Sequence, residues 1–352
     1  MYESFYGFKS KPFQLNPDPS FYYGSRGHRR AMAYLDYGLH QSEGFIVITG
    51  DVGAGKTTLV RSLLQRLDPN KVVAAHLVST QIDADDILRL VAAAFGLPAK
   101  NIEKADLLLQ LEAFLVKLTA GGKRALLVVD EAQNLTQRAV EELRMLSNFQ
   151  LEDHALLQSF LVGQPEFRKT MQSEHMQQLR QRVIATYHLG PLDLAETRAY
   201  VEHRLGCVGW RGDPRIEASA FDVIHNASGG IPRRINTLCD RALLAGFLSE
   251  KHGLSAADVD DVVREMREEA GPELGAGGQM SGVSGFAGSG VFAELLADPS
   301  SIKRLAEIGE GFQSTRLEAR IAQLEQVLGA LLGLAQAQQA AEGAGDQKES
   351  AI

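Results

Sequence analysis

The chain has 352 residues, of which 45% are hydrophobic and 23% charged, and its formal net charge is −8. This composition is ordinary for a globular protein with room for two domains and a sizeable core. Residues 271–352 contain five Lys or Arg and ten Asp or Glu, which leaves a net charge of −3 for residues 1–270. Neither part has the basic surplus of a protein that binds nucleic acid mainly by its phosphates, and no apolar run approaches the roughly 20 residues that span a bilayer.

The first half of the chain alternates short apolar runs with longer helical patterns. Residues 1–40 form an aromatic and proline-rich segment that leads into a first helix at RGHRRAMAYLDYGL. The apolar runs follow at 45–50, 72–78, 125–130, 156–163 and 183–189. Near-continuous apolar strands separated by crossover helices are typical of a parallel sheet that is covered on both faces. We therefore predict an α/β domain over residues 41–190.

No strand pattern follows Pro191, and four helical patterns take its place. They cover residues 193–207, 216–230, 231–250 and 254–269. Three of them begin with a capping residue or a proline: Asp193, Pro232 and Ser255. These features indicate helix starts and predict a small all-helical domain over residues 191–268.

The composition changes again beyond the helical domain. Residues 271–290 are rich in Gly and Ser without periodicity, which predicts a flexible linker within 269–300. Over 301–336 we predict an amphipathic helix whose apolar residues step by four and three positions: Leu317, Ile321, Leu324, Leu328, Leu331 and Ala335. This heptad spacing fits a coiled coil that mediates self-association, and it also fits a lone helix that docks on its own body. Residues 337–352 are predicted to be a disordered tail.

Cysteine usage and the N-terminus bear on the cellular compartment. The two cysteines, Cys207 and Cys239, have no metal-ligand spacing around them. We predict that both are reduced, buried thiols in a cytoplasmic protein. The opening MYESFYGFKSKPF lacks the basic and apolar regions of a signal peptide, so we expect a cytoplasmic location.

The stretch GDVGAGKTT carries the strongest functional signal. It fits the pattern G-x-x-x-x-G-K-S/T in full, directly after a predicted strand and directly before a predicted helix. In such a loop the backbone N–H groups face phosphates, Lys56 reaches the β- and γ-phosphates, and the Thr57 hydroxyl ligates Mg²⁺. The alternative is a tight glycine turn with an incidental lysine. The predicted nucleotide-binding residues are Gly50, Asp51, Val52, Gly53, Ala54, Gly55, Lys56, Thr57 and Thr58, the last of them at the α-phosphate.

A second acidic element follows another predicted strand, in ALLVVDEAQ. A carboxylate at the C-terminal end of that strand, Asp130, can reach the magnesium ion. The next one, Glu131, can orient or deprotonate the attacking water. Asp-Glu at the end of a strand also caps a following helix in many folds. The presence of both this acidic pair and the glycine-rich loop in one sequence favours a nucleotide hydrolase.

Together these residues resemble the AAA+ ATPases, over residues 1 to about 268. Within that superfamily, the opening FYGFKSKPFQLNPDPSFYYGSRGHRRAMAYLDYGL with DEAQNL and LVGQPEF is similar to the general secretion pathway protein A group. MYESFYGF, EGFIVITGDVGAGKTTLV and VSTQIDADDILR most resemble its secretion ATPases associated with exosortase (PEP-CTERM) and exopolysaccharide export systems. The resemblance implies an α/β fold with a five-stranded parallel sheet in a P-loop AAA+ core and a helical lid, to which the heptad spacing adds a C-terminal helical tail.

The resemblance also implies three polar elements around the γ-phosphate. Gln164, after the fourth strand, is the sensor 1 candidate; the alternative is a turn residue before Pro165. The arginine finger, which serves a neighbouring subunit's nucleotide, would be Arg180 or Arg182, and either could instead be a solvated charge at a helix end. Sensor 2 would be the first arginine of SGGIPRRIN, with the second as a spare: Arg233 and Arg234. Its alternative is an ordinary helix start with a proline in the first turn.

The adenine is expected between the sheet domain and the lid, near the N-terminal segment. Leu15, Asn16 and Pro17 could line its pocket, with Phe13 packing beneath. Core packing alone would explain Phe13 and Phe21 equally well.

These observations favour Mg²⁺-dependent ATP hydrolysis with ATP and Mg²⁺ as cofactors. The resemblance implies a role in a secretion or export assembly at the cytoplasmic face of the inner membrane, with self-association and inner-membrane partners. Two alternatives remain: an ATP-dependent DNA-binding regulator like the transposition target-selection ATPases, which the acidic balance disfavours, and a nucleotide-gated scaffold with little turnover. Larger secretion proteins of this group continue into a membrane span and a peptidoglycan-binding region, where this sequence has the linker and the heptad helix, so we do not expect direct binding to the cell wall.

Overall fold

A five-stranded parallel sheet carries the glycine-rich loop at one end of its strand β1. The computed structural model describes residues 1–41, 44–78, 83–151 and 154–270, which belong to one compact unit. The strands are Phe45–Gly50 (β1), Val72–Val78 (β2), Arg124–Asp130 (β3), Leu157–Gly163 (β6) and Val183–Leu189 (β7). Their order is β2-β3-β6-β1-β7, and every pair is parallel. All five predicted strands are confirmed, with ends that shift by one residue at most.

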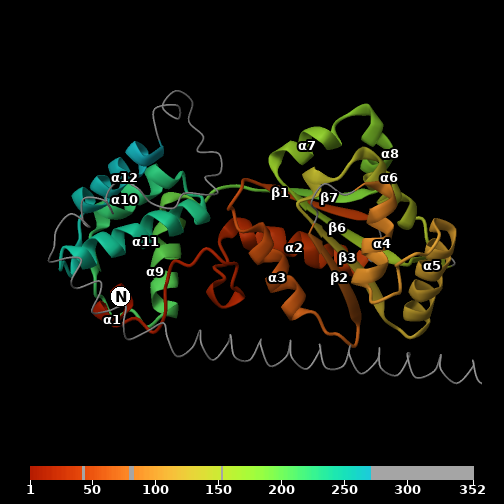
Figure 1. Ribbon diagram of the computed structural model, residues 1–352, viewed down its shortest axis with the longest axis horizontal. Helices are drawn as coiled ribbons and strands as arrows, with labels where there is room; N and C mark the ends of the chain where they lie inside the picture. Colours follow the sequence, from red (N-terminus) through yellow and green to blue (C-terminus); the bar gives the residue numbers. More distant parts are fainter. Residues whose placement is uncertain (42–43, 79–82, 152–153, 271–352) are drawn as a thin grey trace, which may run out of the picture. The chain divides into compact units, whose positions relative to one another are not determined.

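Both faces of this sheet are covered by helices, as the continuous apolar runs predicted. One face packs on α2 and α3, and the other on α4, α5 and α6 (Figure 1). Within β1, Phe45 and Val47 belong to one core and Ile46 and Ile48 to the other, so alternate residues enter opposite layers. The helices are Arg26–Gln41 (α2), Lys56–Arg66 (α3), Ala84–Ala94 (α4), Lys104–Ala120 (α5), Gln137–Leu146 (α6), Pro165–Met171 (α7) and Gln177–Arg180 (α8).

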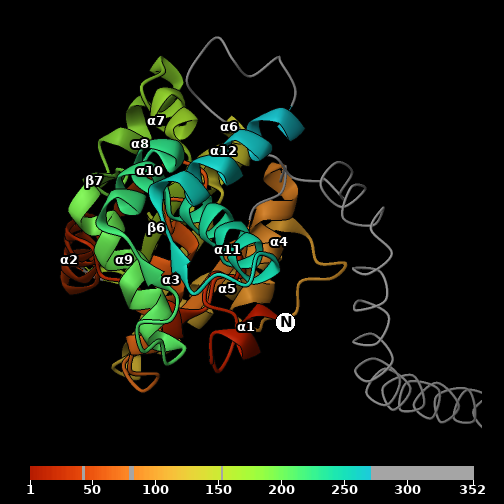
Figure 2. The same ribbon diagram turned by 90° about the vertical axis from the view of Figure 1, so that its left-hand side faces the viewer.

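The four helices predicted after Pro191 are present. They are Leu194–Cys207 (α9), Ala218–Ser228 (α10), Pro232–Leu248 (α11) and Ala256–Ala270 (α12). Asp193 caps α9 by accepting the Glu196 N–H, and the Ser255 hydroxyl accepts the Asp258 N–H at the start of α12. Figure 2 shows α10, α11 and α12 packed side by side.

The N-terminal segment is built into the core of these helices. Its first helix, Tyr2–Phe5 (α1), packs on α11, and the Tyr2 hydroxyl donates a hydrogen bond of 2.6 Å to Asp240 Oδ1. The aromatic residues of this segment that join the apolar core of the four helices are Tyr2, Tyr6, Phe8, Phe13 and Phe21. The aromatic and proline-rich start of the chain thus packs with the helices that follow Pro191.

Two short strand pairs were not predicted. β4 (Gln150–Leu151) pairs antiparallel with β5 (His154–Ala155), and β8 (Arg215–Ile216) pairs parallel with β9 (Gly253–Leu254). The second pair joins two loops of the helical region. Pairs of two residues have no hydrophobic periodicity from which a sequence could predict them.

The prediction of two buried thiols is wrong for one cysteine. Cys239 is buried, and burial raises the pKa of its thiol, whereas Cys207 is exposed. The buried positions of α9 are Thr197, Tyr200, Val201, Arg204 and Leu205, so successive buried residues are three or one positions apart. Cys207 is the last residue of this helix and is not among its buried positions.

The remaining predictions on the chain's C-terminal part fall outside the description. The linker beyond residue 270, the helix at 301–336 and the tail at 337–352 lie outside the described residues. Within the described residues, no helix is both long enough and apolar enough to cross a bilayer.

Candidate nucleotide-binding site

The glycine-rich loop joins β1 to α3 by a turn that needs its glycines. Gly53 and Gly55 have φ angles of +83° and +97°, in the left-handed region that glycine adopts without strain. A Cβ atom at Gly53 would lie 2.4 Å from Arg233 Cβ, and one at Gly55 would lie 2.7 Å from His28 Nε2. Both glycines are therefore required by close neighbours as well as by backbone conformation.

Lys56 begins α3 and is buried beneath this loop. Its ammonium donates hydrogen bonds to the carbonyl oxygens of Gly50, at 2.6 Å, and Asp51, at 2.9 Å. Burial lowers the pKa of Lys56, while the nearby carboxylates of Glu131 and Asp130 oppose the shift. The lysine is thus held at the loop, where its three donor protons can turn to phosphate oxygens.

The two predicted metal ligands are in contact with each other. Thr57 Oγ1 donates a hydrogen bond of 2.7 Å to Asp130 Oδ2, which joins the start of α3 to the end of β3. A hydroxyl and a carboxylate are the oxygen donors that Mg²⁺ prefers. The described residues contain no cluster of three or more His, Cys, Asp or Glu that could hold a metal, so an ion here would take its other ligands from phosphate and water.

Glu131 turns back toward the loop from the end of β3. Its φ angle of +56° is rare for a residue with a side chain, and its N–H donates to Asp130 Oδ1 at 2.9 Å. Its Oε2 accepts hydrogen bonds from Gln133 Nε2, at 2.5 Å, and from Gln164 Nε2, at 3.2 Å. The structure therefore brings the sensor 1 candidate, Gln164, into direct contact with the candidate base.

A cavity of about 350 Å³ opens beside this cluster. Its lining includes Lys56, Thr57, Thr58, Glu131 and Gln164. The loop contributes Val52, Gly53 and Gly55 as well, whereas Gly50, Asp51 and Ala54 are not part of the wall. Asp130 does not line the cavity either, but it accepts a hydrogen bond from Thr57, which does.

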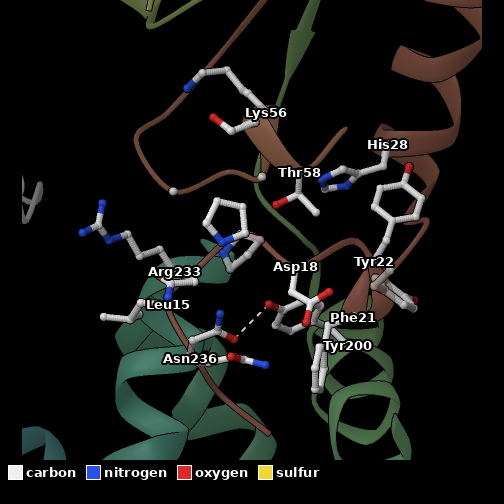
Figure 3. Close-up of a pocket in the computed structure, with 18 of the residues that line it drawn as sticks. Leu15, Asp18, Phe21, Tyr22, His28, Lys56, Thr58, Tyr200, Arg233 and Asn236 are labelled. Carbon is white, nitrogen blue, oxygen red and sulfur yellow. Dashed lines mark hydrogen bonds between the residues drawn. The ribbon is translucent and has the colours of Figure 1, made fainter. Parts of the chain in front are cut away.

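The N-terminal segment supplies another wall of the same cavity (Figure 3). Leu15, Asn16 and Pro17 line it, as expected. Phe21, for which core packing was considered, also lines it. Phe13 does not line the cavity; it is 2% exposed and belongs to the core of the helices α9 to α12. The alternative of core packing therefore describes Phe13.

Several lining residues were not anticipated from the sequence. On α9 and α11, the Tyr200 hydroxyl donates to Asn236 Oδ1 at 2.8 Å, the dashed line of Figure 3. Arg204 is 6% exposed; its Nε donates to the Pro12 carbonyl at 2.7 Å and its Nη1 to the Tyr200 hydroxyl at 3.0 Å. A tyrosine and an arginine four residues apart on a buried helical stripe are the sequence signal that could have revealed them.

His28 on α2 is a further unanticipated residue. It is 5% exposed, and its Nδ1 lies 2.8 Å from Ser25 Oγ while Nε2 faces the loop at Gly55. Burial lowers the pKa of His28 to about 4, against the opposing hydrogen bond to the Ala54 backbone. The ring is therefore neutral at physiological pH and supports the loop without adding charge.

The arginines implied by the resemblance lie in two different places. Arg233, and not Arg234, lines the cavity, and its N–H donates to the Gly53 carbonyl at 3.1 Å. Arg180 and Arg182 lie away from it: Arg180 donates to the carbonyls of Met171 and Ser173, and Arg182 to the carbonyl and hydroxyl of Ser147. Their assignment as arginine fingers remains a prediction.

Comparison with known proteins agrees with this geometry. A family described as an AAA domain matches residues 39–171, which include the loop, Asp130, Glu131 and Gln164. General secretion pathway protein A of Aeromonas hydrophila is 40% identical over 263 residues, which cover 74% of this chain and 47% of that protein. The chain therefore carries an AAA domain over residues 39–171 and is similar to general secretion pathway protein A over 74% of its length.

Solved structures share the fold of this chain. The ORC2 protein of Aeropyrum pernix superposes with a TM-score of 0.58 at 22% identity, covering 73% of this chain and 72% of that chain. Cdc6p of Pyrobaculum aerophilum superposes with a TM-score of 0.55 at 15% identity, covering 72% of this chain and 70% of that chain. At such identities the likeness concerns the fold, with its five-stranded parallel sheet. The chain spans about half the length of the secretion protein it matches.

Proposed function

We propose that this AAA+ ATPase binds ATP with Mg²⁺ in the cavity beside the glycine-rich loop and hydrolyses it. The observation that carries the proposal is the 2.7 Å hydrogen bond between Thr57 and Asp130 at a wall that Lys56 and Glu131 share. It joins the phosphate-binding loop to the acidic strand end. A glycine turn with an incidental lysine would not require this partner.

Each residue of the cluster has a separate task in the proposed reaction. Lys56 exchanges the carbonyls of Gly50 and Asp51 for phosphate oxygens, where its charge is stabilising. Thr57 and Asp130 would hold Mg²⁺, which supplies charge neutralisation on the phosphates. Glu131 accepts a proton from water as the water oxygen bonds to the γ-phosphorus and the bond to ADP breaks.

In this proposal the helical region senses the nucleotide through Arg233. Its N–H is bonded to Gly53, and its side chain belongs to α11, so it connects the loop with the helices after Pro191. A guanidinium at the γ-phosphate would favour a closed arrangement with ATP and release it after hydrolysis. One of Arg180 and Arg182 would serve the nucleotide of a neighbouring copy of this chain.

The proposed setting is a secretion or exopolysaccharide-export system of the exosortase type, with the chain on the cytoplasmic side of the inner membrane. The support is the 40% identity to general secretion pathway protein A, whose name states a role in secretion. A gene for an export protein or an exosortase beside that of this chain is the observation we expect. Its absence would remove the exosortase setting and leave the ATPase.

Two substitutions test the hydrolysis directly. Lys56→Ala should abolish measurable ATP binding, because the phosphates lose their main charged partner. Glu131→Gln should retain ATP binding while turnover falls by about 100-fold or more, the range expected for a lost general base. Binding is measured with a fluorescent ATP analogue, and turnover by phosphate release.

Matched controls come from the exposed face of α5. Lys117→Ala and Glu112→Gln make the same chemical changes at exposed positions of one helix and should leave binding and turnover unchanged. Wild-type turnover in Glu131→Gln would remove that residue from the mechanism. Unimpaired ATP binding by Lys56→Ala would contradict the phosphate site itself.

A further inference from the structure

Gln133 connects the ends of two sheet strands at the candidate catalytic site. It lies in the 3-10 helix Ala132–Asn134 that follows β3, two residues after Glu131. Its Nε2 donates to Glu131 Oε2 at 2.5 Å, and its Oε1 accepts the backbone N–H of Gln164 at 3.0 Å. Gln164 begins the turn between β6 and α7, so one carboxamide bridges the C-terminal ends of β3 and β6.

The orientation of this carboxamide is determined by its partners. The backbone N–H of Gln164 can only donate, so the atom that faces it must be the oxygen of Gln133. The amide nitrogen then faces Glu131, whose carboxylate can accept. A reversed amide would face donor to donor at Gln164 and oxygen to oxygen at Glu131, and would lose both hydrogen bonds.

A closed ring of hydrogen bonds results. Gln164 Nε2 also donates to Glu131 Oε2, so both glutamine side chains contact the same carboxylate oxygen, and Gln133 and Gln164 are bonded to each other. The ring is tightly packed, because a Cβ atom at Gly163 would lie 3.2 Å from Gln133 Oε1. Movement of any member changes the geometry of the other two.

We propose that Gln133 is a positioning residue for ATP hydrolysis, which orients the Glu131 carboxylate and fixes the Gln164 backbone beside it. The inference rests on the proposed function. With Oε2 held by two amide donors, the carboxylate accepts the proton of the attacking water on Oε1. Gln133 itself does not contact the nucleotide, since it is not part of the cavity wall.

Two variants separate the two ends of the carboxamide. Gln133→Glu keeps an oxygen for the Gln164 N–H but replaces the donor at Glu131 by a second carboxylate oxygen. Gln133→Met keeps the length of the side chain and removes both hydrogen bonds. Because a misplacement of about 1 Å can cost 100-fold in rate, we expect kcat to fall by about 10- to 100-fold in both variants.

The expected result is a change in kcat alone. The dissociation constant for an ATP analogue should stay within about threefold of wild type, because the phosphate contacts are intact. Gln172→Met, at an exposed position after α7, is the control and should change neither quantity. The double variant Gln133→Met/Gln164→Met should lose less than the product of the two single losses, because both side chains act on one carboxylate.

Four outcomes are decisive. Wild-type kcat in Gln133→Glu would overturn the inference while leaving the ATPase proposal standing. Parallel losses of nucleotide affinity and kcat in Gln133→Met would also overturn it, since they indicate a general loss of structure. Losses that multiply fully in the double variant would show that the two glutamines act independently. Absence of turnover in the wild-type chain with Mg²⁺ would instead contradict the proposed function.

Discussion

The glycine-rich loop is supported by a buried neutral side chain as well as by its own glycines. His28 approaches Gly55 so closely that any Cβ there would collide with its ring, and Ser25 holds the other ring nitrogen. A protonated imidazole at this position would be a buried cation beneath a loop that already carries buried Lys56. We therefore expect the stability of the fold to depend on pH through this residue.

We predict a loss of stability on acidification that depends on His28. Its folded-state pKa of about 4 lies below the reference value of 6.5, so the unfolded chain binds the proton first as the pH falls. The free energy of unfolding should therefore decrease from about pH 6.5 down to about pH 4, by about 3 kcal/mol from this residue. Urea unfolding at a series of pH values measures the decrease.

His28→Asn is the comparison, because asparagine can still hydrogen bond to Ser25 and does not titrate. Its stability should fall less steeply than wild type over the same pH interval. Parallel curves for the two proteins would show that His28 is not the residue responsible.

The sequence predicted site residues that lie in continuous motifs and missed those brought together by tertiary packing. Lys56 and Thr57 begin the helix after β1, and Asp130 and Glu131 lie at the end of β3, where local pattern and chemistry coincide. The hydrogen bond between Gln133 and Gln164 forms because β3 and β6 are neighbours in the sheet. These two strands are not consecutive in the sequence, since β4 and β5 lie between them. Strand order is not encoded in the hydrophobic pattern of single strands, so this contact could not be read from the sequence.

The N-terminal segment lines one side of the cavity, and two arginines from different helices donate hydrogen bonds to its backbone. Arg204 of α9 donates to the carbonyls of Pro12 and Gln14, at 2.7 and 3.3 Å. Arg61 of α3 donates to the Pro17 carbonyl at 2.6 Å. The cavity-lining residues between them are thus attached to the helical region at one end and to the phosphate-binding helix at the other.

Loss of the buried arginine should weaken nucleotide binding without affecting the chemical step. Arg204→Met keeps the apolar stem and removes the donors to the segment and to Tyr200. We expect the dissociation constant for ATP to rise by about tenfold or more, the equivalent of one or two hydrogen bonds to a charged group, with kcat at saturation unchanged. Titration with an ATP analogue and a turnover curve against ATP concentration measure the two quantities.

The exposed Arg211 provides the control, and Arg211→Met should behave as wild type in both assays. A fall in kcat with unchanged affinity in Arg204→Met would contradict a role for the segment in nucleotide binding.

The long strands and helices were predictable from the sequence, whereas the two-residue strand pairs were not. The strands β1, β3 and β6 are buried on both faces, which produces the continuous apolar runs that indicated them. The caps at Asp193 and Ser255 and the proline at 232 likewise located three helix starts. The pair β8 and β9 consists of two residues in each strand and depends on loop contacts.

At the scale of the whole molecule, the α/β domain, which carries the AAA domain match, and the helical region both line the cavity. Arg233 and the Gly53 carbonyl connect the two regions at the glycine-rich loop, and residues 12–17 connect them again across the cavity. The nucleotide that we propose for this cavity would contact both regions, as a nucleotide-driven cycle requires. The proposed ATP hydrolysis depends on a Mg²⁺ ion that is bound to the triphosphate and held by Thr57 and Asp130.

The magnesium dependence of ATP turnover, measured in the wild type and in Asp130→Asn, tests this magnesium site. We expect no turnover in EDTA, recovery on addition of Mg²⁺, and a half-saturating Mg²⁺ concentration about tenfold or more higher in the variant, because one anionic ligand is lost. Turnover that persists in EDTA, or an identical Mg²⁺ dependence in the two proteins, would contradict it.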